Sequence, residues 1–294
     1  MVNTSNQLIR EVWAKNLEEE FENIRNLLPK YPYISMDTEF PGVVARPIGN
    51  FSSTSDYHYQ LLRCNVDLLK IIQLGITLSD AEGNLPSDGV PSTWQFNFKF
   101  RLDKDMYARD SIELLEKAGI DFSKNEKYGI DLEDFGEILT DSGLVLMPEI
   151  KWLSFHSGYD FGYLLKMLTC EPLPPNEEKF YELLHTFFPC VYDIKFIIRG
   201  LKTLKGGLQD VADELQCQRI GTQHQAGSDS LLTASAFFKL REKYLDNKID
   251  DSTYKGYLFG LRAKSPSSAP GTASNTNNNS AVASNQTKVN LTAA

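Results

Sequence analysis

Residues 33–40 read YISMDTEF, an alternation of apolar and polar side chains that predicts a β-strand. The more apolar face carries Ile34, Met36, Thr38 and Phe40. Asp37 and Glu39 share the opposite face, with α-carbons about 6–7 Å apart. The same D-x-E spacing also begins at Asp80, in a turn, and at Asp131, at a helix start. Of the three, only the pair that begins at Asp37 lies at the end of a strand with an apolar opposite face. This pair could be a functional pair of carboxylates or simply a solvated strand end, and both interpretations stay open.

Two more strands are predicted downstream. Residues 71–78 form a nearly continuous apolar run, and residues 93–100 alternate cleanly, with four aromatic side chains on one face. The stretch between them contains Gly and Pro and suits a hairpin connection. With residues 33–40, these two segments predict a three-stranded antiparallel block.

Helical periodicity dominates the rest of the chain. Apolar residues recur at helical spacing over residues 16–28 and again from Asp160 onward. A short apolar strand is predicted at residues 152–155. Further helices are predicted at residues 111–118, 131–140, 177–186, 208–215 and 230–244. Strands first, then alternating strands and helices, favour an α/β fold with one mixed sheet and helices on both faces.

The net charge is unevenly distributed. The 30 Lys and Arg against 39 Asp and Glu give −9 for the whole chain of 294 residues. The last segment contains three basic residues, Arg262, Lys264 and Lys288, and no acid, so residues 1–261 carry −12. Such a body will not bind nucleic acid by bulk attraction, so a polyanion would need a local source of positive charge. Residues 262–294 are rich in Ser, Asn, Thr and Ala, which predicts a disordered tail.

Several classes of protein are disfavoured by the sequence. It has no run of about eighteen apolar residues and no apolar signal segment, so we expect no membrane span and no secretion. The four cysteines never approach C-x-x-C spacing, which argues against a zinc knuckle or a redox motif. We therefore expect a cytosolic or nuclear protein with reduced thiols.

Two further segments place acids where helices begin. In FHSGYD, a strand ends and a helix begins at Asp160. In HQAGSD, His224 stands five residues before Asp229, just ahead of another helix. An acid at a helix N-terminus is favoured by the helix dipole, so each segment alone is also compatible with a structural role.

Together, the four acids indicate a metal site. Two carboxylates about 4 Å apart repel by roughly 4 kcal/mol at an effective dielectric constant near 20, so a group of four needs protons or cations. Oxygen ligands select hard ions such as Mg²⁺ or Mn²⁺, and a pair of such ions suits in-line displacement at a phosphodiester. Two divalent ions would also supply the missing positive charge.

This order of motifs resembles the DEDD 3′-to-5′ exonucleases of the RNase H-like fold. A D-x-E on the first strand, an acid opening a middle helix and an H-x4-D at a late helix are the shared features. His224 stands five residues before Asp229 and Gln225 stands four before it, which matches the His branch of that superfamily.

Longer strings carry a closer resemblance. The segments MDTEFPGVVARPIG, DYHYQLLRCNVDLLKIIQLG, KWLSFHSGYDFGYLLK and RIGTQHQAGSDSLLT resemble the CCR-associated factor (Caf, or Pop) deadenylase family, the catalytic nuclease of the CCR-NOT complex. The likeness runs from about Ile9 to Leu261. It implies a DEDD-type ribonuclease domain over residues 1–261, followed by the tail at 262–294, to which no function is carried.

The resemblance implies the activity and its residues. Poly(A)-specific 3′-to-5′ hydrolysis of mRNA tails would release AMP. Asp37, Glu39, Asp160 and Asp229 match the ligands of two divalent ions, Mg²⁺ or Mn²⁺, and His224 matches the general base. The hypothesis is that one ion holds a water from which His224 takes a proton while the second ion stabilises the leaving 3′ oxygen.

The resemblance also implies partners and compartments. Besides poly(A) RNA, these are a NOT-type scaffold subunit, a leucine-rich-repeat deadenylase and antiproliferative BTG/Tob-type proteins, in the cytoplasm and the nucleus. A general 3′ exonuclease acting on DNA or structured RNA stays open, because no residue can be tied to an adenine edge from sequence. An adaptor with vestigial catalysis is a further alternative, which the complete set of motif residues disfavours.

Overall fold

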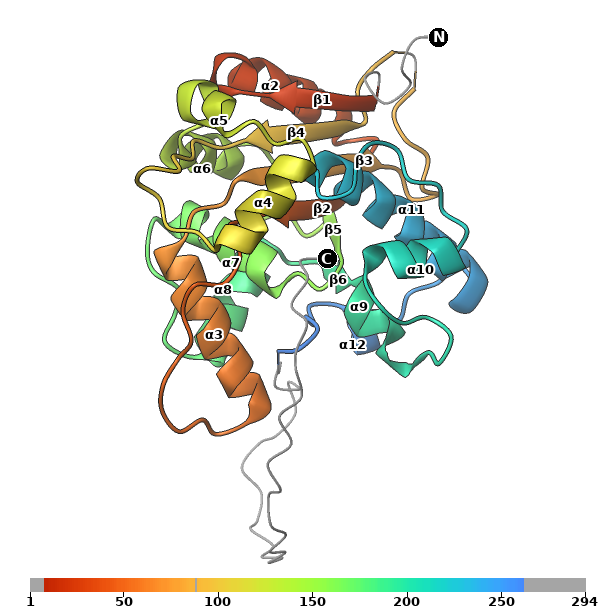
Figure 1. Ribbon diagram of the computed structural model, residues 1–294. Helices are drawn as coiled ribbons and strands as arrows, with labels where there is room; N and C mark the ends of the chain where they lie inside the picture. The colour runs from red at the N-terminus through yellow and green to blue at the C-terminus, as the bar shows by residue number, and fades with distance from the viewer. Residues whose placement is uncertain (1–7, 88, 262–294) are drawn as a thin grey trace, which may run out of the picture.

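Six strands form one mixed sheet in the computed structural model, which describes residues 8–87 and 89–261 (Figure 1). The strands are β1 (Ile9–Val12), β2 (Tyr33–Glu39), β3 (Gln73–Ser79), β4 (Thr93–Asn97), β5 (Lys151–Ser154) and β6 (Val191–Asp193). Their order across the sheet is β1-β4-β3-β2-β5-β6. β2 therefore lies inside the sheet, between β3 and β5.

The predicted antiparallel block is confirmed. β3 pairs antiparallel with β2 on one side and with β4 on the other, while the remaining neighbours pair parallel. The third strand of the block is shorter than predicted and ends at Asn97. Beyond it, Phe98 forms an isolated bridge with Ile130, and Lys99 donates its backbone N–H to the Ile130 carbonyl, so a later segment takes over the pairing.

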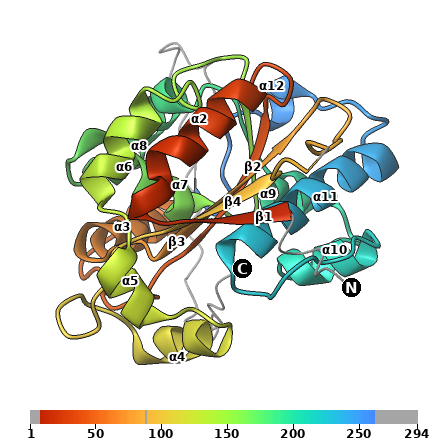
Figure 2. The ribbon, with the colours of Figure 1, turned by 90° about the horizontal axis from the view of Figure 1, so that it is seen from above.

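Helices cover both faces of the sheet, as predicted (Figure 2). On one face, α11 (Ala226–Tyr244) packs across β2, β3 and β4, with α10 (Leu208–Glu214) beside it. The other face carries α2 (Leu17–Leu27), α6 (Leu132–Thr140) and α7 (Gly158–Thr169). The rings of Phe21, Phe96 and Phe135 meet between α2, β4 and α6, with centroids 5.1–5.5 Å apart. The apolar side of the alternating strands is thus the core.

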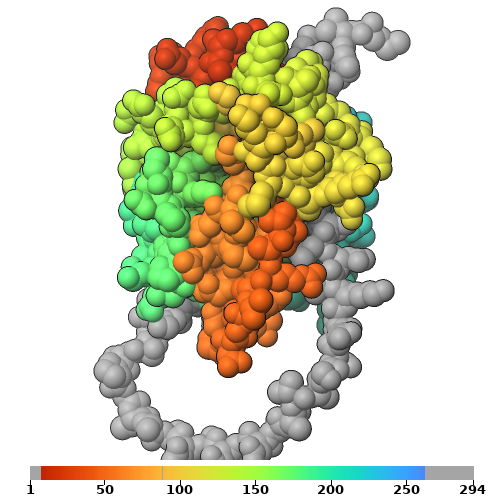
Figure 3. Space-filling model, turned by 60° about the vertical axis from the view of Figure 1, so that its left-hand side comes forward, coloured from red at the N-terminus to blue at the C-terminus, as the bar shows by residue number. Residues whose placement is uncertain are grey.

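Several elements were not predicted. β1 has four residues, of which only Val12 is buried, and β6 has three, so neither shows a readable period. Among the described residues, six further helices were not predicted either: η1 (Ala14–Asn16), α3 (Thr54–Leu68), α5 (Phe122–Tyr128), α9 (Ile194–Ile197), η2 (Ile198–Gly200) and α12 (Asp251–Tyr254). In contrast, α4 (Arg109–Lys117) and α8 (Glu177–Phe187) confirm predicted helices. α3 lies below the α4 segment on one face of the molecule (Figure 3).

None of the described helices is long and apolar enough to cross a bilayer. The predicted tail, residues 262–294, lies outside the described residues.

Candidate active site

The acidic pair of β2 is buried. Asp37 is 5% exposed and Glu39 is 2% exposed. Their ladder partners on β3 are Gly75 and Gln73, so backbone pairing fixes both positions in the middle of the sheet. A solvated strand end, one of the two interpretations of the sequence, is therefore wrong.

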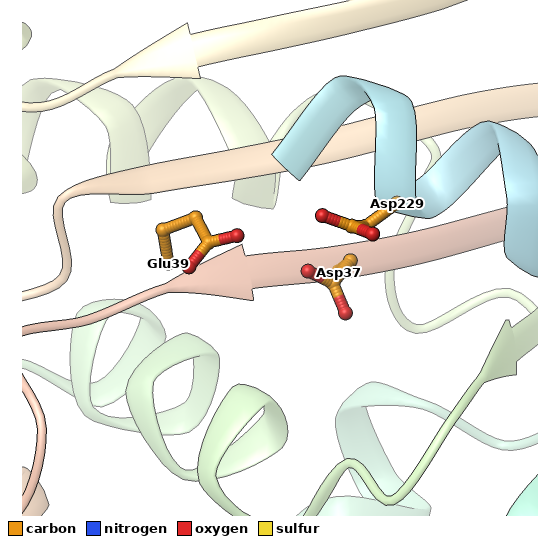
Figure 4. Close-up of side chains that lie close together, drawn as sticks. All are labelled: Asp37, Glu39 and Asp229. Carbon is orange, nitrogen blue, oxygen red and sulfur yellow. The ribbon is translucent and has the colours of Figure 1, made fainter. Parts of the chain in front are cut away.

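A glycine lets the third acid reach this pair. A β-carbon on Gly75 would lie 1.9 Å from the Ala226 carbonyl oxygen and 2.7 Å from the Gly227 nitrogen. The first turn of α11 therefore packs directly on the β3 backbone, which no larger residue would allow. This close approach brings Asp229 over β2, where Asp37, Glu39 and Asp229 each place a carboxylate oxygen within 4.8 Å of the others (Figure 4).

Asp160 approaches β2 from α7. It lies in the first turn of that helix and is 7% exposed. Its Oδ1 accepts hydrogen bonds from the Thr38 backbone N–H at 3.0 Å and the Thr38 hydroxyl at 2.7 Å. Thr38 therefore fixes Asp160 beside the group of three, and the charge of Asp160 helps raise the pKa of both Asp37 and Glu39.

His224 is held by its backbone. It adopts a left-handed conformation, with φ at 63°, and its N–H donates to Asp229 Oδ2 at 2.9 Å. Within the described part of the chain, its buried ring Nδ1 has no hydrogen-bond partner. The imidazole therefore has one nitrogen uncommitted, and it is close enough to Asp229 to lower the pKa of that acid.

The electrostatics show carboxylates in need of positive charge. Desolvation is the main cause that raises the pKa of Asp37 and Glu39 well above the ordinary values, and Asp229 and Asp160 raise them further. Burial raises the pKa of Asp160 to about 6 although the bonds from Thr38 oppose this. Burial also raises the pKa of Asp229, against the effect of Arg219.

Two neighbours of the site escaped the sequence analysis. Arg219 donates to Asp229 Oδ1 at 2.7 Å. Asp193, the last residue of β6, accepts from the backbone N–H groups of His156 and Ser157, the turn that leads into α7. No spacing rule marks either residue, because a lone basic residue in a loop and a lone acid at the end of a short strand are common.

The chain matches the model of the CAF1 family ribonucleases over residues 12–133 and 144–237. The chain belongs to this family. Curated CAF1 relatives include the poly(A) ribonuclease pop2 of Schizosaccharomyces pombe, 57% identical over 86% of this chain and 75% of that protein. The probable CCR4-associated factor 1 homolog 7 of Arabidopsis thaliana is 51% identical over 86% of this chain and 93% of that protein.

Solved structures of CAF1 proteins have the same fold. S. pombe Pop2p, in a form with Mg²⁺ and Mn²⁺ bound, superposes with a TM-score of 0.83 at 57% identity, over 86% of this chain and 99% of that one. The RNase domain of yeast Pop2 superposes with a TM-score of 0.76 at 37% identity, over 89% of this chain and 97% of that one. Exonuclease I superposes with a TM-score of 0.51 at 11% identity, over 73% of this chain and 41% of the exonuclease chain. This match shows a shared fold alone. The expected RNase H-like architecture is thereby confirmed.

Proposed function

We propose that this protein is a metal-dependent 3′-to-5′ exoribonuclease that shortens the poly(A) tails of mRNA and releases AMP. The observation that carries the proposal is the meeting of Asp37, Glu39 and Asp229 from two distant segments, with Asp160 beside them. Membership of the CAF1 ribonucleases supports the reaction type. The poly(A) specificity rests on the 57% identical S. pombe relative, which is named a poly(A) ribonuclease.

The residues fit divalent cations. The buried Glu39 Oε1 has no hydrogen-bond partner among the described residues, so a strong acceptor faces the other carboxylates unsatisfied. An all-oxygen donor set selects hard ions, and S. pombe Pop2p was solved with Mg²⁺ and Mn²⁺ bound. We assign Asp37, Glu39, Asp160 and Asp229 as the residues that hold two such ions. When bound, the ions supply Lewis-acid activation of the attacking water and stabilise the leaving oxygen.

His224 is assigned as the general base. It is held beside Asp229 by its own backbone N–H, and its ring is not committed to a structural hydrogen bond at Nδ1. A neutral imidazole nitrogen accepts the proton that the attacking water loses, and it later passes that proton to solvent. With its left-handed backbone, His224 directs its own N–H at an acid of the site.

The purified chain offers a direct test. Twenty-nucleotide tracts of A, of U and of deoxy-A are incubated with the protein in Mg²⁺ or Mn²⁺, and released mononucleotides are quantified. We expect AMP from the A tract as the main product, with none after EDTA treatment. Equal degradation of all three tracts would favour the general exonuclease, and metal-dependent activity of the isolated chain argues against a vestigial adaptor.

Partner binding is part of the proposal. A yeast structure of the NOT1 MIF4G domain with CAF1 matches this chain with a TM-score of 0.72 at 37% identity, which supports a NOT-type scaffold as partner. A leucine-rich-repeat deadenylase and BTG/Tob-type proteins are further proposed partners, in the cytoplasm and the nucleus. We assign the catalytic role to residues 1–261 and none to residues 262–294. Co-purification with a NOT1-type MIF4G domain tests the first of these partners.

A further inference from the structure

Arg219 ties the acidic site to its surroundings. It lies in the loop between α10 and α11, and its side chain is 13% exposed. Its Nη1 donates to Asp229 Oδ1 at 2.7 Å and to the Ser228 hydroxyl at 3.0 Å. Its Nε donates to Gln209 Oε1 at 2.6 Å. The guanidinium is therefore fixed from α10 on one side and from α11 on the other.

Arg219 also brings positive charge to the acids. Of the ion pairs found within residues 8–87 and 89–261, the one between Arg219 and Asp229 is the only one that involves an acid of the site. The guanidinium lowers the pKa of Asp37, Glu39 and Asp229, opposing the larger effect of burial. Since arginine stays protonated at any physiological pH, this charge is permanent.

The contact leaves Asp229 free to bind an ion. Arg219 occupies one lone pair of Oδ1, and the His224 N–H occupies one lone pair of Oδ2. Each oxygen of an ionised carboxylate has a second lone pair. The two donors therefore fix the orientation of Asp229 without exhausting its capacity as a ligand.

Charge balance indicates what the guanidinium adds. Four ionised carboxylates and two divalent cations cancel, so the loaded site without Arg219 is neutral. With Arg219 it carries one positive charge, which one phosphodiester group cancels. The positive charge of Arg219 also repels the two cations, whereas the negative carboxylates attract them.

We propose that Arg219 is a positioning residue that orients Asp229 and shifts the loaded site from favouring cations toward accepting one RNA phosphate. This inference rests on the proposed function. It assigns a role in phosphate acceptance to a residue outside the four acids and the imidazole. Its distinguishing consequence is a pair of opposite effects: without the charge, cations bind more tightly and RNA binds more weakly. A merely structural tie between α10 and α11 would weaken both.

Two readouts on the full chain separate these outcomes. Mn²⁺ affinity of the metal-free protein is measured by titration calorimetry, and kcat and KM are measured on a twenty-nucleotide A tract. For R219Q we expect Mn²⁺ binding at least about tenfold tighter and a KM at least about tenfold higher. R219K keeps the charge but cannot reach both Asp229 and Gln209, so both quantities should stay within about threefold of the parent.

Two further variants serve as controls. Q209L removes the contact to α10 while leaving the charge and the Asp229 bond, and it should behave as R219K does. R63Q removes a partly buried guanidinium that pairs with Asp67 at 3.8 Å on α3, and it should leave Mn²⁺ affinity and KM unchanged. Thermal unfolding of each metal-free variant checks that it is folded.

Parallel losses of Mn²⁺ affinity and activity in R219Q would overturn the inference. If R219Q does not fold, R219M is measured in its place: tighter Mn²⁺ binding with a higher KM supports the role of the charge, and a loss of both Mn²⁺ affinity and activity overturns it. If the parent binds Mn²⁺ and degrades RNA but R219Q does not show opposite changes in Mn²⁺ affinity and KM, this inference alone is overturned. A parent that binds no Mn²⁺ overturns the proposed function as well.

Discussion

Glu39 and Asp193 are buried carboxylates that each end a strand of the same sheet, yet their surroundings are opposite. Glu39 is 2% exposed and Asp193 is fully buried. Asp193 accepts backbone N–H bonds from His156 at 2.8 Å, Lys195 at 2.9 Å and Phe259 at 2.9 Å. Glu39 faces other carboxylates, and its Oε1 has no partner among the described residues.

The difference separates a structural acid from a functional one. Donors from the chain stabilise the charge of Asp193, so that acid holds the turn before α7 and the segment around residue 259 in place. The charge of Glu39 has no such donors, so folding leaves it to be stabilised by something from outside. Burial alone therefore does not identify a site, whereas a buried carboxylate oxygen that lacks donors and lies among other carboxylates indicates one.

The largest expected effect is on Glu39. Glu39→Gln keeps the shape but removes one ligand charge, and loss of metal-ion stabilisation worth several kcal/mol should lower kcat by about 10³-fold. The metal-free variant should be at least as stable as the parent, because repulsion among the acids is relieved. Turnover on an A tract and urea unfolding in EDTA measure the two effects. Turnover equal to that of the parent would mean that Glu39 is not a ligand of the catalytic ions.

His224 should follow Glu39 in the size of its effect. Asn tolerates the left-handed backbone, so His224→Asn should keep the fold while removing the base, and kcat should fall by about 10²-fold. Mn²⁺ affinity, measured by calorimetry, should change by less than about threefold since no ligand is lost. A large loss of Mn²⁺ binding instead would make His224 a ligand or a structural residue.

Asp193 should show the reverse pattern. Asp193→Asn puts an amide NH₂ among backbone N–H donors, and the free energy of unfolding should fall by about 2–4 kcal/mol. The folded variant should retain kcat within about tenfold, because no ligand is touched. Urea titration and turnover at low temperature give the two values. A stable but inactive variant would contradict the distinction drawn between the two acids.

Asp160 is a proposed ligand that also has donors from Thr38, and the smallest of the expected effects is the one on its pH-dependent stability. Its pKa of about 6 lies above the ordinary 3.8, so in metal-free protein its contribution to stability is present below pH 4 and is lost as pH rises through 6. Asp160→Asn removes this dependence. Between pH 7.5 and 4.5, the free energy of unfolding measured by urea titration in EDTA should shift in favour of the parent by roughly 2 kcal/mol. A pH-independent difference would mean that Asp160 is not desolvated.

The sequence predicted the parts of the fold that have a clear period. β2, β3 and β4 show alternation or a continuous apolar run, and α2 and α11 have long helical patterns. β1 and β6 are too short for a period, and α3 buries the polar Asn65, which accepts from the backbone N–H groups of Val44 and Ala45. Such a helix depends on a distant loop, which its own sequence does not reveal.

The candidate acids were also named from sequence, because strand ends and helix starts leave a local pattern. The residues that hold these acids in place were not predicted. Thr38 meets Asp160 across 122 positions of the chain, and Gly75 matters only because α11 packs on it. Arg219 shows its role only through contacts with two helices. Long-range contacts of this kind leave no spacing to read, so they required the structure.

Anomalous diffraction from a crystal of this protein soaked in Mn²⁺ tests the central claim most directly. The account predicts two peaks between β2, α7 and α11, each within coordination distance of oxygens from Asp37, Glu39, Asp160 or Asp229. Peaks confined to other surfaces, or a soaked crystal with no peak among these four carboxylates, would contradict it.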